Sequence, residues 1–226
     1  YAPVGGAFLV TLAIAAVAAS LALFVEALAA AARTRAALLF GVIAVVFAGG
    51  AALARVEWTV PSGAPVAVSL VQGNVTQELK FNPDFRRATF DLYLRLVDAS
   101  RGRLVVLPES AFPVFADEVP DSVLRRMREV VAARDGDVLV GMFTVEPPLV
   151  AGGGPRYYNS VVSVGAAQSQ LYRKRHLVPF GETIPLEPVV GWFIRRVLSI
   201  PLANQASGDP DPPVLDVAGQ RVAVNI

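Results

Sequence analysis

Two stretches of this chain carry residue types that can do acid–base chemistry. Lys174 stands at the end of a β-like run, and an apolar turn with proline and glycine follows it and carries Glu182. Much earlier in the chain, the apolar run 104–107 is followed by Glu109. A carboxylate that accepts a proton and an ammonium that stabilises negative charge are two parts of a hydrolase-type active site. The third part, a nucleophile, is missing, and the chain contains no cysteine.

The elements that would position these residues alternate between strands and helices. Apolar runs predict strands at 66–71, 103–107, 137–145, 157–164 and 168–173, with a turn joining the last two as in a hairpin. Apolar residues at helical spacing predict helices at 84–100 and 121–134, the second with Asp121 as its N-cap. A final hairpin is predicted from 214–217 and 221–226 around Ala218 and Gly219. This alternation predicts an α/β fold with a largely buried sheet.

The strand ends indicate where a site would form. In sheets of this kind, reactive groups gather at the carboxyl ends of the strands. Glu109 and Lys174 both follow predicted strands, so we expect them at the same edge of the sheet. The predicted strand 222–226 stops where a nucleophile at a strand end would come next.

The N-terminal part is too apolar for an ordinary soluble domain. The whole chain is 54% hydrophobic with a mean hydropathy of +0.52, and residues 4–25 and 36–54 carry no charge. Each stretch is long enough to cross a bilayer core of about 30 Å as a helix. We therefore predict two membrane spans within 1–57, a linker at 58–65 with Trp58 as an interfacial anchor, and a domain at 66–226.

The charges beside these spans predict their orientation. Arg33 and Arg35 lie in the connection between the spans, whereas Arg55 beyond the second span is offset by Glu57. The positive-inside tendency places the connection in the cytoplasm and the domain on the other side of the membrane. Two alternatives are a signal peptide, which would need a basic region before its apolar core, and buried core helices, which would show charged faces.

Composition also excludes several kinds of site. A net charge of +1 without a dense basic cluster argues against nucleic-acid binding. The absence of cysteine excludes disulfides and thiolate metal sites within these residues, and a single histidine argues against a histidine metal site. We therefore predict neither a metal nor a cofactor.

An ordered set of motifs resembles a known family. The set consists of VQGN at 71–74, LPES-AFP at 107–113, YYNSVV at 157–162, KRHLVPFGE at 174–182 and RVAVNI at 221–226. It resembles the apolipoprotein N-acyltransferases, the membrane-bound branch of the nitrilase (carbon–nitrogen hydrolase) superfamily. The resemblance implies a nitrilase-like αββα sandwich on the periplasmic face of a bacterial inner membrane, in a multi-pass protein.

The resemblance also implies a Glu-Lys-Cys triad. Glu109 matches the general base, Lys174 the residue that stabilises the oxyanion, and Glu182 a further glutamate of the active site. In the family, the cysteine directly follows a strand like 221–226. We therefore expect the chain to be truncated before its nucleophile and to be inactive as it stands.

Three further residues are assigned to substrate binding. Phe81 falls where some family members carry a tryptophan near the entrance for the acyl chain. Asn159 lies in the YYNSVV motif, where the alternative is a hydrogen bond to a buried backbone group. Trp192 begins the apolar segment 192–200, within a predicted helix at 188–198, which could be a lid at the membrane surface or could pack on the sandwich.

The reaction implied by the resemblance has two acyl-transfer steps. A cysteine takes an acyl group from a membrane phospholipid as a thioester, and the amino group of a diacylglyceryl-modified apolipoprotein cysteine then receives it. Glu109 would accept the thiol proton if its surroundings are partly desolvated, and Lys174 would stabilise the oxyanion. The alternatives are a membrane-tethered amidase that acts on a small amide, and a catalytically silent relative that serves as a binding module.

Overall fold

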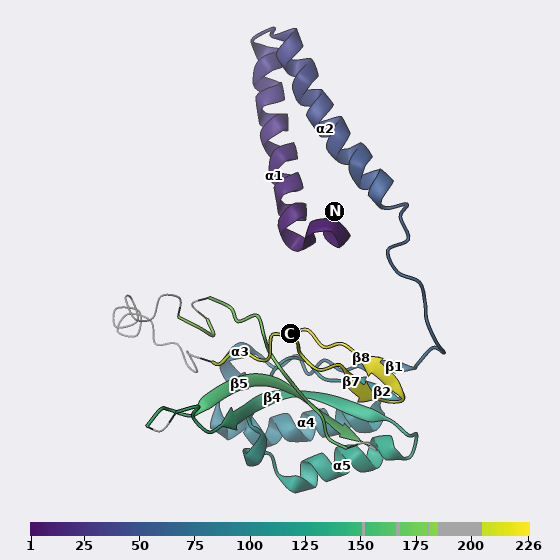
Figure 1. Ribbon diagram of the computed structural model, residues 1–226, viewed down its shortest axis with the longest axis vertical. Coiled ribbons are helices and arrows are strands. Elements are labelled where there is room, and N and C mark those ends of the chain that lie inside the picture. The colour runs from purple at the N-terminus through teal and green to yellow at the C-terminus, as the bar shows by residue number, and fades with distance from the viewer. Residues whose placement is uncertain (151, 166–167, 180, 185–204) are drawn as a thin grey trace. The chain divides into compact units, whose positions relative to one another are not determined.

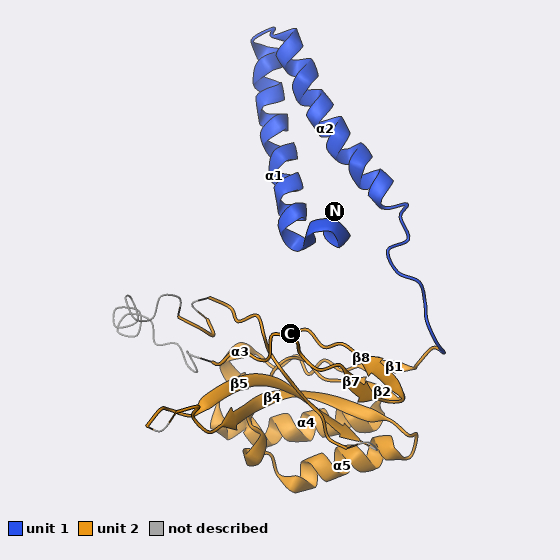
Figure 2. Ribbon diagram, in the orientation of Figure 1, with its two compact units in different colours: residues 1–64 blue, residues 65–226 orange. Residues whose placement is uncertain are grey.

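The computed structural model describes residues 1–150, 152–165, 168–179, 181–184 and 205–226. The chain divides into two compact units, 1–64 and 65–226, which Figure 2 colours separately.

The first unit is a pair of long helices. Helix α1 spans Ala2–Ala29, with non-helical backbone at Gly5 and Gly6, and α2 spans Arg33–Leu53. The two helices pack against each other, and the rings of Phe24 and Phe40 lie 6.3 Å apart. Both helices are long and apolar enough to cross a membrane, and most of their surface is not buried in the protein. An apolar surface on all sides is typical of a helix surrounded by lipid.

The second unit is built on a mixed six-stranded sheet. Its strands are β1 (Val68–Leu70), β2 (Leu104–Val106), β3 (Phe112–Phe115), β4 (Asp137–Glu146), β5 (Arg156–Gly165) and β6 (Leu171–Arg173). The order across the sheet is β1-β2-β4-β5-β6, and β3 also pairs with β4. Strands β1, β2 and β3 run parallel to β4, whereas β5 runs antiparallel to both β4 and β6. Strand β6 therefore points in the same direction as β2 and β4.

Helices cover one face of this sheet. They are α4 (Arg86–Ala99), which follows the 3-10 turn Pro83–Phe85, and α5 (Asp121–Ala132), which follows the 3-10 turn Ala116–Glu118. Val105, Val138 and Val140 belong to the hydrophobic cluster that includes both helices. Figure 1 shows α4 and α5 side by side beneath β4 and β5.

The other face packs against a small hairpin. Leu104 and Leu139 alternate with the valines of the first face and belong to a second cluster with β7 (Leu215–Val217) and β8 (Gln220–Val222). This alternation follows from the two-residue period of side chains along a strand. The described residues thus form a helix layer, a sheet and a second, two-stranded sheet. The α/β prediction is confirmed, and the arrangement is consistent with a nitrilase-like domain.

Several local predictions were wrong. Pro120, not Asp121, is the N-cap of α5, and Asp121 is the first helical residue. There its carboxylate still interacts favourably with the positive end of the helix dipole. The strand predicted at 222–226 ends at Val222. Beyond it, Val224 and Ile226 pack on the second cluster without a ladder partner among the described residues.

One α-helix and one strand were not predicted at all. Helix α3, Gln77–Lys80, has a single turn and is too short for a helical period to appear. Strand β3 contains Pro113, and a proline within a run argues against a strand.

Candidate active site

The predicted catalytic residues meet at one edge of the sheet. Glu109 follows β2, and Lys174 is the residue directly after β6. Asn159 lies near the start of the antiparallel strand β5, and its carbonyl accepts a hydrogen bond from the Lys174 main-chain N at 2.8 Å. Because β2 and β6 run in the same direction and β5 runs against them, all three positions fall at the same edge.

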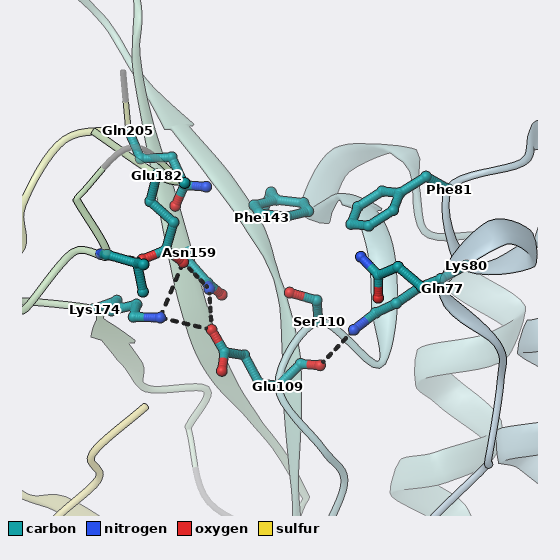
Figure 3. A pocket seen from close by; sticks show the side chains of 12 residues that line it. Gln77, Lys80, Phe81, Glu109, Ser110, Phe143, Asn159, Lys174, Glu182 and Gln205 are labelled. Atoms are coloured by element: carbon teal, nitrogen blue, oxygen red, sulfur yellow. Dashed lines mark hydrogen bonds and ion pairs between the residues drawn. The ribbon is translucent and has the colours of Figure 1, made fainter. Parts of the chain in front are cut away.

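Lys174 lies between two carboxylates. Its Nζ is 2.9 Å from Glu109 Oε1 and 2.9 Å from Glu182 Oε1, as Figure 3 shows. The Lys174 side chain is only 7% exposed and that of Glu182 15%, whereas the Glu109 side chain is 42% exposed. The ammonium is thus fixed within the protein, and one of its two carboxylate partners remains open to solvent.

Asn159 connects the same two carboxylates. Its Nδ2 donates to Glu109 Oε1 at 2.6 Å and lies 3.3 Å from Glu182 Oε1. Its Oδ1 is buried and has no hydrogen-bond partner among the described residues. The side chain therefore contacts the two glutamates, and not a backbone group as in the alternative prediction.

The turn after Lys174 presents Glu182. The main-chain N of Val178 donates to Glu182 Oε2 at 2.9 Å, and Glu182 N donates to Val178 O at 2.9 Å. One carboxylate oxygen thus closes the turn while the other binds Lys174. Glu182 is at once a turn residue and a partner of the ammonium.

The surroundings keep this pair charged. Burial lowers the pKa of Lys174, but the hydrogen bonds and charges of Glu109 and Glu182 outweigh it, so the pKa is raised above its ordinary value. Burial raises the pKa of Glu182, but the Val178 N–H, Lys174 and Asn159 together lower it below its ordinary value. At neutral pH, Lys174 is therefore an ammonium and Glu182 a carboxylate.

Two glycines allow the backbone to carry these residues. A Cβ at Gly141 of β4 would lie 2.6 Å from both Pro108 O and Ser110 N, so only glycine lets the Glu109 turn lie against this strand. Ser110 itself has a φ of 48°, which is unusual for a residue other than glycine. On the other side, Gly208 N donates to Lys174 O at 2.8 Å, and a Cβ at Gly208 would overlap the Arg173 carbonyl.

A cavity of about 610 Å³ opens at this site. Besides Glu109, Lys174, Glu182 and Asn159, its lining residues are polar or aromatic side chains and parts of the turn after Lys174: Gln77, Lys80, Phe81, Ser110, Phe143, Val178, Gly181 and Gln205. Phe81, 44% exposed, therefore lies in the same cavity as the charged residues. Trp192 and the helix predicted at 188–198 lie outside the described residues.

Sequence reasoning missed several residues of this cavity. Lys80 Nζ donates to the main-chain O of Glu109 at 3.2 Å, and Gln205 N donates to Glu182 O at 2.9 Å. A signal for Lys80 was present, because only two of the chain's 20 lysine and arginine residues are lysines, and the other is Lys174. No comparable signal marks Gln205.

The geometry can support acyl transfer to and from a nucleophile. Glu109 offers a carboxylate open to the cavity, and Lys174 offers a fixed positive charge beside it. No group of three or more histidine, cysteine or acidic side chains is placed to hold a metal ion in the part of the chain that the structure describes.

Comparison with known proteins relates the chain to one group of enzymes. No family model matches the chain. The apolipoprotein N-acyltransferase of Chromobacterium violaceum is 38% identical over 226 residues, covering 100% of this chain and 42% of that protein. The chain is a relative of the apolipoprotein N-acyltransferases.

Two further relatives agree. The apolipoprotein N-acyltransferase of Nitrosomonas europaea is 47% identical over 177 residues, which cover 78% of this chain and 34% of that protein. That of Ralstonia nicotianae is 38% identical over 229 residues, covering 100% of this chain and 41% of that protein. The resemblance drawn from the motifs is confirmed, and the chain spans less than half the length of the relatives it matches.

Proposed function

We propose that the whole protein to which these residues belong is an apolipoprotein N-acyltransferase. It would move a fatty acyl group from a membrane phospholipid to the amino group of a diacylglyceryl-modified cysteine on an apolipoprotein. The observation that carries the proposal is the buried Lys174 between Glu109 and Glu182. All 226 residues of this chain also align with part of such an enzyme.

The site residues have distinct roles in this proposal. Glu109, whose carboxylate reaches the cavity, accepts the proton of the nucleophile and later that of the incoming amine. Lys174 supplies positive charge where the oxyanion of each tetrahedral intermediate develops. Glu182 and Asn159 fix the ammonium and the Glu109 carboxylate relative to each other.

The nucleophile in this proposal is a cysteine, as the resemblance implies. None of the 226 residues is a cysteine, so the proposal concerns the whole protein and not this stretch alone. Glu109 takes the thiol proton, the thiolate attacks the phospholipid ester, and Glu109 gives that proton to the oxygen of the leaving lysophospholipid. The amine then attacks the thioester, and Glu109 carries the amine proton to the leaving thiolate, which restores the thiol.

The two apolar helices fit substrates that are held in lipid. Donor and acceptor are both membrane-anchored, so a site tethered to the membrane gains effective concentration. We propose that the protein is a multi-pass protein of a bacterial inner membrane, with the 65–226 unit on the periplasmic face. Phe81 would contact the acyl chain where it enters the cavity.

An acyl-transfer assay tests the proposal. The full-length protein, purified in detergent, is mixed with a phospholipid and a diacylglyceryl-cysteine peptide, and mass spectrometry follows the peptide. We expect a mass gain of one acyl chain, at a rate that Glu109→Gln and Lys174→Met reduce strongly. Hydrolysis of a small amide without acyl transfer would instead favour the membrane-tethered amidase, and no activity on either substrate would favour a silent binding module.

A further inference from the structure

The two lysines of the chain line the same cavity. All other basic side chains, apart from one histidine, are arginines, so an ammonium occurs only at Lys80 and Lys174. The two come from distant elements, the single-turn helix α3 and the end of β6. Lysine offers a compact charge with three donors, which suits a small anionic group. The role of Lys174 is assigned above, and that of Lys80 is open.

The two ammonium groups have different partners. Lys174 is bound by two carboxylates, whose charges outweigh its own. Lys80 donates to the main-chain O of Glu109, and none of the ion pairs among the described residues includes it. Figure 3 shows the two lysines on opposite sides of Glu109. Among the residues that the structure describes, Lys80 is therefore the lysine of this cavity whose charge no carboxylate binds directly.

The neighbours of Lys80 suit an amphiphilic molecule. Phe81, the next residue, lines the same cavity with an aromatic ring, and the ring of Phe143 lies across from it in Figure 3. Lys80 also lines a second cavity of about 200 Å³, together with polar groups that include Gln72 and Asn74. A charged group at Lys80 would thus have apolar surface on one side and polar space on the other.

We propose that Lys80 binds the phosphate of the phospholipid acyl donor. This inference rests on the proposed function. In a glycerophospholipid, the glycerol backbone separates the phosphate from the ester that reacts. Lys174 contacts the side-chain carboxylate of Glu109, whereas Lys80 contacts its main-chain O. The ester would react beside the carboxylate while the phosphate reaches Lys80. Burial lowers the pKa of Lys80, which the charge of Glu109 partly offsets, and a bound phosphate would stabilise the ammonium further.

The test compares two acyl donors with the full-length protein in detergent. One donor is phosphatidylethanolamine, and the other is an uncharged para-nitrophenyl ester of a long-chain fatty acid. For Lys80→Met we expect KM to rise about tenfold or more with the phospholipid, as for the loss of a hydrogen bond to a charged group, and much less with the ester. Lys80→Arg should retain most of the preference for the phospholipid, because a guanidinium also binds phosphate.

Arg87→Met is the matched control. Arg87 is an exposed basic residue of α4, outside the cavity. Its replacement should leave the KM for both donors unchanged. Equal losses with both donors in Lys80→Met, or no loss with either, would overturn the assignment. If the wild-type protein uses neither donor, the proposed function fails instead, so the two failures can be told apart. Thermal unfolding of Lys80→Met checks that the variant is folded.

Discussion

Glu109 and Lys174 follow strands that are not neighbours in the sheet, yet their side chains meet at 2.9 Å. Strands β4 and β5 lie between β2 and β6 in the sheet, so the Lys174–Glu109 ion pair joins residues that follow strands separated by two others. Asn159 of β5 occupies the space between and donates to Glu109 Oε1. The site therefore depends on the register of the whole sheet, and the predictions below test the contacts that maintain it.

Replacing Lys174 should affect both activity and folding. Lys174→Met removes the cation between two carboxylates, and we expect activity to fall roughly a hundredfold or more. The Glu109 side chain is 42% exposed, so solvent screens part of its interaction with Lys174. We therefore expect the variant to lose about 1–3 kcal/mol of unfolding free energy. Urea unfolding and the acyl-transfer assay measure the two quantities.

A double variant separates the two effects of Lys174. In Lys174→Met with Glu182→Gln, one of the two facing carboxylates is gone. Part of the lost stability should return, while activity stays at the low level of Lys174→Met. Recovery of activity in the double variant would contradict the role given to Lys174.

Asn159 should act by holding two carboxylates together. Asn159→Asp places a third carboxylate beside Glu109 and Glu182, in a group that contains one ammonium. We expect lower stability at neutral pH than in Asn159→Ala, and a relative gain as the pH falls and carboxylates become protonated. Thermal unfolding of both variants at neutral and mildly acidic pH tests this. The same pH response in both variants would show that charge repulsion is not involved.

Stability should fall at both ends of the pH range. The pKa of Glu182 is lowered, so its contribution is complete above the ordinary value of 4.5 and is lost as the pH falls through the lower, folded-state pKa. The pKa of Lys174 is raised, so its contribution is complete below 10.5 and is lost as the pH rises through the higher, folded-state pKa.

Urea unfolding over this range measures both limits. In Glu182→Gln the acid limb should become shallower, because the group that titrates there is gone. An unchanged acid limb in this variant would assign the effect to other carboxylates.

A methyl group at Gly141 should displace the Glu109 turn. Gly141→Ala adds a Cβ 2.6 Å from the backbone of this turn, and we expect a cost of about 1–3 kcal/mol with a large loss of kcat. Gly154→Ala is the matched control, because a Cβ there meets nothing within 4 Å. If both variants keep full activity, the close approach at Gly141 does not position Glu109.

The sequence by itself determined the α/β class and the two helices apolar enough to cross a membrane. It also identified Glu109, Lys174 and Glu182 as a group, because apolar periodicity marks strands and because the motifs around these residues resemble those of a known family. Both signals are local, since each lies within a short run of residues.

Only the tertiary structure decided which distant groups meet. The joint hydrogen bonds of Asn159 and the location of Lys80 beside Glu109 arise from strand register and from a helix of one turn. No sequence period reports such contacts, because they join residues whose separation along the chain says nothing of their distance. The two lysines illustrate the difference: the sequence shows that they are rare, and folding places both in one cavity.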